Sequence, residues 1–334
     1  MTPLSLLDLT RVREDLGPGV ALHTAARIAA HVESLDFKRY WVAEHHNMVG
    51  VASAAVAVVL AHVAAQTTRI RIGAGGIMLP NHAPYIVAEQ FGTLARLHPG
   101  RIDLGLGRAP GTDGVTLIRA LRRDPQGAEH FPQDVVELMG WFAPENDLGI
   151  TAVPAAGAEV EMLILGSSLF GAQLAGHLGL PFAFASHFAP SQLHEALHVY
   201  RSHFRPSDRL AAPHAIVAVN VMCAETEAEA QHLFTTMQQG FLGLIRGNRR
   251  YQMPPGPLDW TPREERQVAA MLACRAVGTP DQVRDSLRDL VAQTQADELM
   301  LVTDTHDLAA RQTSLTLTAK AWTWMRYAAR QWKN

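Results

Sequence analysis

The segment from Ile70 to Gly107 carries the pattern that decides the fold. Ile70-Arg-Ile-Gly-Ala-Gly75 and Ile102-Asp-Leu-Gly-Leu-Gly107 are short β-rich runs, and the stretch Ala83–Leu97 between them has helical character. A helix between two strands is the usual connection of a parallel pair, because a parallel connection must return the chain to the starting edge of the sheet. The segment therefore predicts one βα unit followed by the strand of the next.

The same alternation continues in both directions from this segment. Six further strands are expected, at Leu4–Leu9, Tyr40–Glu44, Glu161–Leu165, Phe182–Ala185, His214–Met222 and Glu298–Thr303. Helices are expected at Leu22–Leu35, Ser53–Gln66, Gln133–Phe142, Leu169–Leu178, Pro190–Phe204, Thr226–Ile245, Pro262–Cys274, Pro280–Gln293 and Leu308–Trp332.

Eight strands alternating with helices predict a single α/β domain over residues 1–334, a (β/α)8 TIM barrel. A long loop is expected over Arg108–Pro154, and a helical and loop insertion between the seventh and eighth strands. The alternative, a doubly wound sheet, needs Gly-x-Gly-x-x-Gly between a strand and a helix. Gly105-Leu-Gly107 comes near, but Arg108-Ala-Pro follows it, so the barrel is favoured.

Composition excludes several classes of protein. The 334 residues are 48% apolar and 18% charged, with a net charge of −3 and scattered basic residues, so we expect no nucleic-acid or membrane partner. Cys223 and Cys274 lack the spacing of a zinc site or a disulfide framework, which predicts a cytoplasmic protein. Ser53 and His62 interrupt the apolar run Val51–Ala65, which we therefore expect to be a core helix.

A cluster of proton-exchanging side chains follows the second predicted strand. Glu44, His45, His46 and Asn47 crowd an acid, two imidazoles and an amide onto one carboxyl end, which is where barrel enzymes place their active sites. Histidine can exchange a proton near neutral pH, and a carboxylate can fix its tautomer. From the residues alone, a proton relay, a metal site and a polar loop all remain open. No spacing compels ligands such as His82, His187 and His306 to converge, so no metal is expected.

Glycine-rich segments follow three other predicted strands. Gly73–Gly76 could let the backbone approach a flat ligand, or could simply form a turn. After Gly107, the guanidinium of Arg108 suits a phosphate, a carboxylate or a loop-fixing ion pair. Gly166-Ser167-Ser168-Leu-Phe-Gly171 opens a helix, where free amides and hydroxyls can bind an anion or cap the helix. Arg108 and this helix start could together hold one phosphate.

In these segments the chain resembles the bacterial luciferase-like monooxygenase family. The resemblance covers nearly the whole chain in order, through Glu44-His45-His46, Gly73–Pro80, His98–Asp113, Leu165–Ser168 and Gly179–Ser186, and then Val277–Pro280 and Ala296–Leu299. It implies a barrel that binds reduced FMN, or alternatively the deazaflavin F420, at its carboxyl end. It further implies that reduced FMN and oxygen form a flavin C4a-hydroperoxide, which oxidises a small organic substrate.

The resemblance also implies roles for particular residues. His45 would lie beside the flavin as the proton manager, with Glu44 or Asn47 orienting it and His46 sharing or supporting that role. Gly75-Gly76 would pack under the ring, often through a cis peptide bond, and Gly107 would border the flavin. The family pattern assigns phosphate contacts to Arg108, Ser168 and Gly171, beside Gly166 and Ser167.

The resemblance also implies partners for the protein, and the sequence differs from the light-emitting members of the family at two places. A separate flavin reductase would supply the reduced FMN, and the protein would be a homodimer. Light-emitting members have a cysteine where Gly107 stands, and the helix at Gln133–Phe142 lacks their second phosphate-binding arginine. Light emission is therefore not expected. An F420-dependent hydride-transfer enzyme and a non-catalytic flavin-binding barrel remain as alternatives.

Overall fold

A computed structural model describes residues 1–145, 149–248 and 250–323. Within these residues the sheet has the strand order β6-β5-β4-β3-β2-β1-β9-β7-β8, with β6 also paired to β7. The parallel pairing of Phe182 with Ala215 joins β6 to β7 and closes the barrel. The barrel strands are β1 (Leu4–Asp8), β2 (Arg39–Val42), β3 (Arg71–Met78), β4 (Ile102–Gly107), β5 (Glu161–Gly166), β6 (Phe182–Phe184), β7 (Ala215–Cys223) and β9 (Glu298–Val302).

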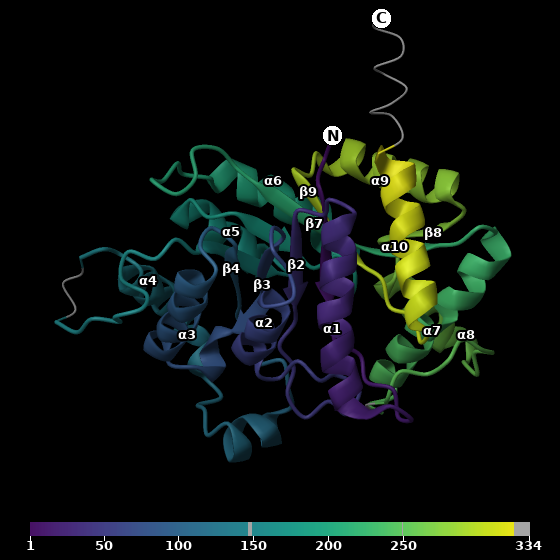
Figure 1. The fold of residues 1–334 in the computed structure, drawn as a ribbon, viewed down its shortest axis with the longest axis horizontal. Helices are drawn as coiled ribbons and strands as arrows, with labels where there is room; N and C mark the ends of the chain where they lie inside the picture. The colour runs from purple at the N-terminus through teal and green to yellow at the C-terminus, as the bar shows by residue number, and fades with distance from the viewer. Residues whose placement is uncertain (146–148, 249, 324–334) are drawn as a thin grey trace, which may run out of the picture.

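Helices surround this barrel and connect its strands. Figure 1 shows the first and last of them, α1 and α10, side by side, which completes the outer ring. The helices are α1 (Gly17–Ser34), α2 (Val56–Ala64), α3 (Pro84–Leu97), α4 (Phe131–Trp141), α5 (Leu169–Leu178), α6 (Leu193–His203), α7 (Glu227–Ile245), α8 (Pro262–Met271), α9 (Pro280–Thr294) and α10 (Leu308–Thr323). Among the described helices, none combines the length and apolarity that a bilayer span requires.

The predicted (β/α)8 barrel is confirmed. Its eight predicted strands correspond to β1–β7 and β9, with ends that differ by a few residues. The insertion after β7 contains, besides α7 to α9, the short strand β8 (Arg275–Gly278), which pairs with the end of β7 and was not predicted. The last helix is described as far as Thr323, and the rest of its predicted range, to Trp332, lies outside the described residues.

The region predicted as a loop over Arg108–Pro154 contains more helix than expected. Besides α4 it holds a π-helical turn, η2 (Thr116–Ala120), and the short helix η3 (Gly127–Glu129). Both are too short to show a hydrophobic period in the sequence, so tertiary contacts decide them. The short helices η1 (Leu79–Asn81) and η4 (Pro190–Gln192) flank β3 and α6.

Local chemistry explains where several helices begin and end. Thr261 and Thr279 form capping boxes with Glu264 and Gln282, so that backbone amides at the starts of α8 and α9 have acceptors. Gly179 ends α5 in the left-handed region at φ 61°, a conformation that glycine adopts without steric cost.

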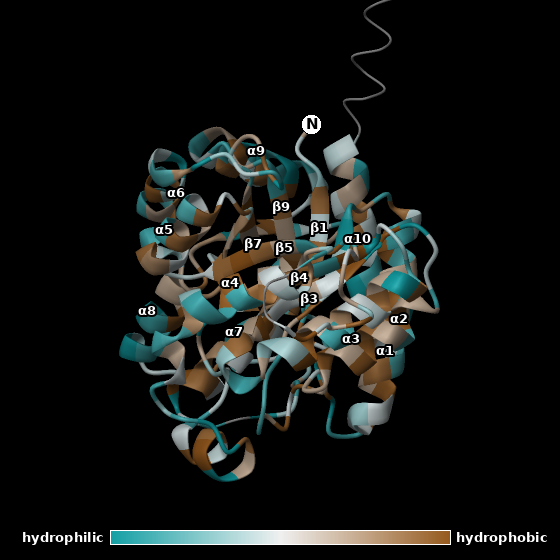
Figure 2. Ribbon diagram, turned by 90° about the vertical axis from the view of Figure 1, so that its left-hand side faces the viewer, coloured by the Kyte–Doolittle hydropathy of each residue, from teal (hydrophilic) through white to brown (hydrophobic). Residues whose placement is uncertain are grey.

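Two apolar layers hold the fold together. One lies between the outside of the barrel and the helices, and the other fills the barrel and continues under α7 and α8. Figure 2 shows apolar colouring concentrated on the strands and on the inner sides of the helices. Strands covered on both faces must be apolar on both faces, which is why most barrel strands are near-continuous apolar runs.

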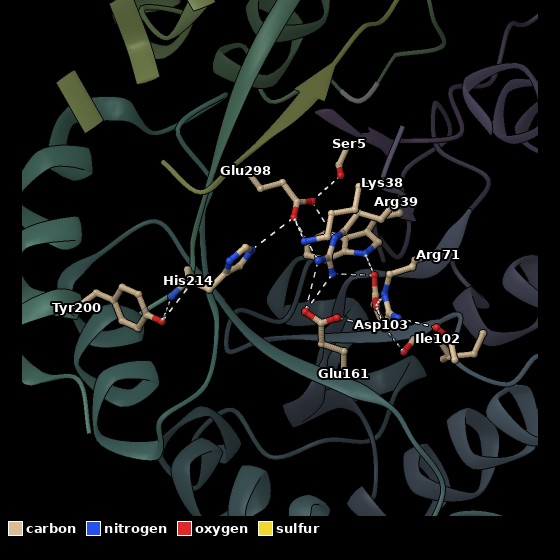
Figure 3. Close-up of polar contacts among 12 residues, drawn as sticks. Ser5, Lys38, Arg39, Arg71, Ile102, Asp103, Glu161, Tyr200, His214 and Glu298 are labelled. Atoms are coloured by element: carbon tan, nitrogen blue, oxygen red, sulfur yellow. Dashed lines mark hydrogen bonds and ion pairs between the residues drawn. The ribbon is translucent and has the colours of Figure 1, made fainter. Parts of the chain in front are cut away.

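A network of charged residues fills the amino end of the barrel (Figure 3). Arg39 is fully buried, and its guanidinium pairs with Asp103 at 3.0 Å, Glu298 at 2.8 Å and Glu161 at 3.4 Å. Lys38 and Arg71 add cations to the same carboxylates. Three cations thus balance three acids. This is the end of a TIM barrel where side chains serve stability and not chemistry.

Candidate functional site

Glu44, just beyond β2, is the centre of a hydrogen-bond network at the carboxyl end of the barrel. Its carboxylate is fully buried, and Oε1 lies 2.6 Å from Nε2 of His46 and 2.8 Å from Nε2 of His82. Oε2 accepts the backbone N–H of Met78, the last residue of β3, at 2.9 Å. One carboxylate therefore ties the ends of β2 and β3 to the loop that follows η1.

Hydrogen bonding determines the charge state of Glu44. Burial on its own would raise the pKa of the carboxyl, but the hydrogen bonds from His46 and His82, the His82 charge and the Met78 amide lower that pKa to about 2. Glu44 is consequently an anion at physiological pH, able to orient both imidazoles.

A depressed pKa predicts how Glu44 contributes to stability. The folded value of about 2 lies below the unfolded value of 4.5, so the contribution is complete above pH 4.5 and is lost as the pH falls toward 2. We expect the unfolding free energy of the wild type to fall more steeply in this range than that of Glu44→Gln. Urea unfolding at a series of pH values measures the difference, and parallel pH curves for the two proteins would contradict it.

His45 takes no part in the hydrogen bonds around Glu44. Burial, first, and the charges of Arg11 and His46 lower its pKa, while a backbone hydrogen bond with Gly111 and the charge of Glu44 act in the opposite direction. The net shift is downward. The imidazole is therefore neutral at neutral pH and able to accept a proton.

The expected orientation of His45 by Glu44 needs correction. Both Glu44 oxygens are occupied by His46, His82 and Met78, so Glu44 acts on His45 through its charge alone. Asn47 donates to Asp113 and Thr116 and so joins this loop to the start of η2. The side chains point in different directions. Those of His46 and His82 reach the buried carboxylate, whereas the His45 imidazole contacts the backbone of Gly111.

Glu44, His46 and His82 also form the group of ligand atoms that could hold a metal among the described residues, all within 4.8 Å of one another. A four-coordinate ion with ligands about 2.0–2.1 Å away would hold those atoms about 3.3 Å apart. The Nε2 to Oε1 distances of 2.6 and 2.8 Å are instead those of hydrogen bonds. The arrangement therefore favours a proton network, and the absence of a metal stays a prediction.

The glycines of β3 and β4 are required by packing inside the barrel. A Cβ on Gly75 would lie 2.8 Å from Leu7 and 2.9 Å from Trp41, and one on Gly76 would lie 2.6 Å from the backbone of Gly105. The Gly75-Gly76 peptide bond is cis, as the family resemblance implied. A Cβ on Gly107 would meet the Met78 sulfur at 3.1 Å. Packing alone therefore requires glycine at these strand ends, whether or not a ligand also approaches the backbone there.

Arg108, which follows β4 in the chain, lies beside the start of α5 in space. Its guanidinium carbon is 4.1 Å from the ring centroid of Phe170, the second residue of that helix. Ser168 is the N-cap residue, but its hydroxyl makes no capping hydrogen bond. Gly166 and Gly171 pack closely, since a Cβ on Gly166 would lie 3.5 Å from the Gly171 Cα. Arg108 therefore lies beside the first turn of α5, and its role toward a phosphate there stays a prediction.

Three side chains of this region were not among the predicted site residues. The sequence suggests His82 and His187, which follows β6, only as possible metal ligands, and it gives no role to Phe170. His82 and His187 could have been found by asking which histidines follow predicted strands. The stacking of Phe170 on Arg108 has no signal in the sequence, because it joins residues 62 positions apart across two strands.

The sequence matches a known protein family over most of its length. The model of the family described as luciferase-like monooxygenase matches residues 2–298. The chain belongs to the luciferase-like monooxygenase family. Another luciferase-like monooxygenase, from Escherichia coli K12, is 47% identical over 320 residues, which cover 94% of this chain and 95% of that one. The N-acetyl-S-alkylcysteine monooxygenase of Bacillus subtilis is 32% identical and covers 69% of this chain and 70% of its own. The family and these relatives together support the assignment of this protein as an oxidoreductase.

Solved structures of other proteins share the fold. That of apo-MsnO8 has a TM-score of 0.86 at 32% identity and covers 96% of this chain and 98% of its own. More distant barrels show the fold alone. The oxygenating constituent of 3,6-diketocamphane monooxygenase in complex with FMN has a TM-score of 0.71 at 17% identity, covering 96% and 98%. An F420-dependent secondary alcohol dehydrogenase has a TM-score of 0.67 at 16% identity, covering 96% and 99%.

Proposed function

We propose that this luciferase-like protein is a monooxygenase that uses reduced FMN and oxygen to oxidise a small organic substrate. The observation that carries the proposal is the placement of a neutral imidazole, His45, and a converging anion site, Arg108 with the start of α5, at the same carboxyl end of the barrel. The name of the FMN-bound barrel supports FMN, and that of the F420-dependent barrel keeps F420 as the alternative.

The residues present fit a flavin phosphate. The first amides of α5 offer unpaired donors, the Ser168 hydroxyl is free of a capping role, and Phe170 holds the Arg108 guanidinium beside them. Arg108 supplies the charge that a phosphate dianion needs, and Gly166 and Gly171 bring the helix start close to β5. These residues would hold the phosphate end of FMN, with Gly75, Gly76 and Gly107 near the ring.

Reduced FMN, when bound, supplies the electrons that activate oxygen. The protein then has two tasks that its own side chains can perform. His45, neutral and mostly buried, accepts and returns a proton at an imidazole nitrogen close to the reacting atoms. The anionic Glu44 fixes His46 and His82 and holds the end of β3 through the Met78 amide, so that the surrounding loops keep their positions.

Side-by-side titration tests the cofactor. We expect FMN to quench or shift in fluorescence on binding with a far lower Kd than F420, and the loaded protein to consume oxygen when the flavin is reduced. Tighter binding of F420, with hydride transfer in the absence of oxygen, would replace the proposal with its alternative. Binding of FMN without oxygen consumption over a broad substrate panel would instead favour a non-catalytic flavin-binding barrel.

Arg108→Ala tests the phosphate site. Losing a charge-assisted contact should raise the Kd for FMN about 10- to 100-fold. Riboflavin, which lacks the phosphate, should bind the variant about as well as it binds the wild type. Arg119→Ala removes an exposed arginine from η2 and is the matched control. An equal loss of FMN and riboflavin binding in Arg108→Ala would show that the arginine supports the loop and not the phosphate.

We also propose that a separate flavin reductase delivers the reduced FMN and that the protein works as a homodimer. Exposed apolar side chains on two neighbouring helices support the second point. Val58 on α2 is 71% exposed, and Ile86 and Leu97 on α3 are 46% and 65% exposed. Apolar side chains gathered on one surface often mark a contact between subunits.

A further inference from the structure

His187 is a buried imidazole that the proposed mechanism does not use. It follows β6, which lies four strands from β2 in either direction around the closed barrel. Its loop therefore faces the loop of Glu44, His45 and His46 across the carboxyl end. The His45 imidazole acts electrostatically on His187, which places the two rings in the same region.

The surroundings of His187 fix its backbone but leave one ring nitrogen without a hydrogen-bond partner. Its carbonyl accepts a hydrogen bond from Asn220 Nδ2 of β7 at 2.6 Å, and its ring meets Phe188 edge to face at 4.9 Å. The residue is 8% exposed, and Nδ1 is buried without a hydrogen-bond partner. Buried polar atoms normally have partners, because an unpaired one loses its hydrogen bonds to water without gaining any in the protein.

The contrast with the other histidines of this end is chemical. His46 and His82 both direct Nε2 at Glu44, whose charge fixes their role. For His187, burial and the nearby His45 lower the pKa to about 4, so the ring is neutral at physiological pH. A neutral imidazole presents one N–H donor and one acceptor nitrogen, and it offers no charge to a carboxylate.

Apolar side chains also lie at this end of the barrel, beside the polar residues already described. Leu9, Leu165 and Val277 lie at or next to the ends of three other strands, and they stay partly exposed where they pack on the apolar interior of the barrel. Phe188 is 40% exposed beside the His187 ring. Such a surrounding suits a molecule with little polar surface and a single polar group to fix its orientation.

We propose that His187 is a substrate-recognition residue, which hydrogen-bonds a neutral polar group, such as a ketone or hydroxyl, on an otherwise apolar molecule. This inference rests on the proposed function and names its substrate class. It also separates the two sides of the site: His45 manages the proton, and His187 on the opposite rim fixes the substrate.

Binding of two matched probes tests the inference. Cyclohexanone and cyclohexanecarboxylate share a ring and differ in the group that His187 would meet. With FMN bound, we expect the wild type to bind the ketone more tightly, and His187→Leu to weaken ketone binding about tenfold, the worth of one hydrogen bond. His187→Gln, which keeps a donor, should restore most of that affinity. His194→Leu, at an exposed position of α6, should change neither probe.

The FMN Kd of each variant distinguishes this inference from the function on which it rests. If the wild type does not bind FMN, the proposed function fails. If FMN binds normally but His187→Leu keeps its ketone affinity, the inference fails and Nδ1 has a structural role. A wild type that prefers the carboxylate, or that binds neither probe, overturns the neutral substrate class.

Discussion

Replacing His45 by alanine should lower the rate of substrate oxidation about 10²- to 10⁴-fold, the range for removal of a positioned proton-transfer group. The side chain is mostly buried, its pKa is lowered chiefly by that burial, and the neighbouring carboxylate of Glu44 is held by hydrogen bonds with His46, His82 and the Met78 amide. FMN affinity should change by less than about threefold, because the proposed phosphate contacts lie at α5, away from His45. Single-turnover oxidation and FMN titration measure the two effects.

The pH profile gives a second measure of the same role. A lowered pKa means that wild-type His45 stays neutral down to a pH below 6.5, and the rate should fall as acid protonates it there. His45→Ala should lack this acidic limb. His232→Ala, at an exposed histidine of α7, should keep both the rate and the limb. Normal turnover in His45→Ala would remove the residue from the mechanism.

The largest loss of stability is expected from Arg39→Met at the other end of the barrel. Asp103 and Glu298 are buried, and Glu161 is partly so, and all three pair with this guanidinium. Removing the cation leaves buried negative charge without a partner, which costs about 3–5 kcal/mol at neutral pH. Urea unfolding measures the change. Arg27→Met, at an exposed position of α1, should alter stability by less than about 0.5 kcal/mol.

Acid should narrow the difference between Arg39→Met and the wild type. In the wild type, burial opposes ionisation of Glu298, but His214, Arg39 and Lys38 lower its pKa to about 2, so its stabilisation is present above pH 4.5 and declines below it. In the variant the unpaired carboxylates gain stability on protonation. Arg39→Lys, which keeps a charge but not the forked geometry, should lie between the two and remains measurable if Arg39→Met does not fold. A deficit that is constant with pH would show lost packing instead.

Much of this protein can be predicted from its sequence. Apolar strand runs at regular intervals, such as Ile70–Gly75 and Ile102–Gly107, fix the barrel because each must be buried on both faces. Since the carboxyl ends of parallel strands meet at one end of the barrel, the order of residues along the chain also places Glu44, His45, Arg108 and Ser168 there. Local order along the chain suffices for both conclusions.

Other features depend on contacts between residues far apart in sequence. That Glu44 binds His46 and His82, that Phe170 stacks on Arg108, and that His187 shares an electrostatic environment with His45 are set by side-chain directions across several strands. The pairing of Arg39 with three acids likewise requires the closed barrel. The sequence by itself determines the fold and the end of the barrel at which the candidate site lies. Only the tertiary structure decides which side chains pair with each other. Hydrogen bonds and ion pairs depend on distances of a few ångströms, which the hydrophobic pattern of the sequence does not determine.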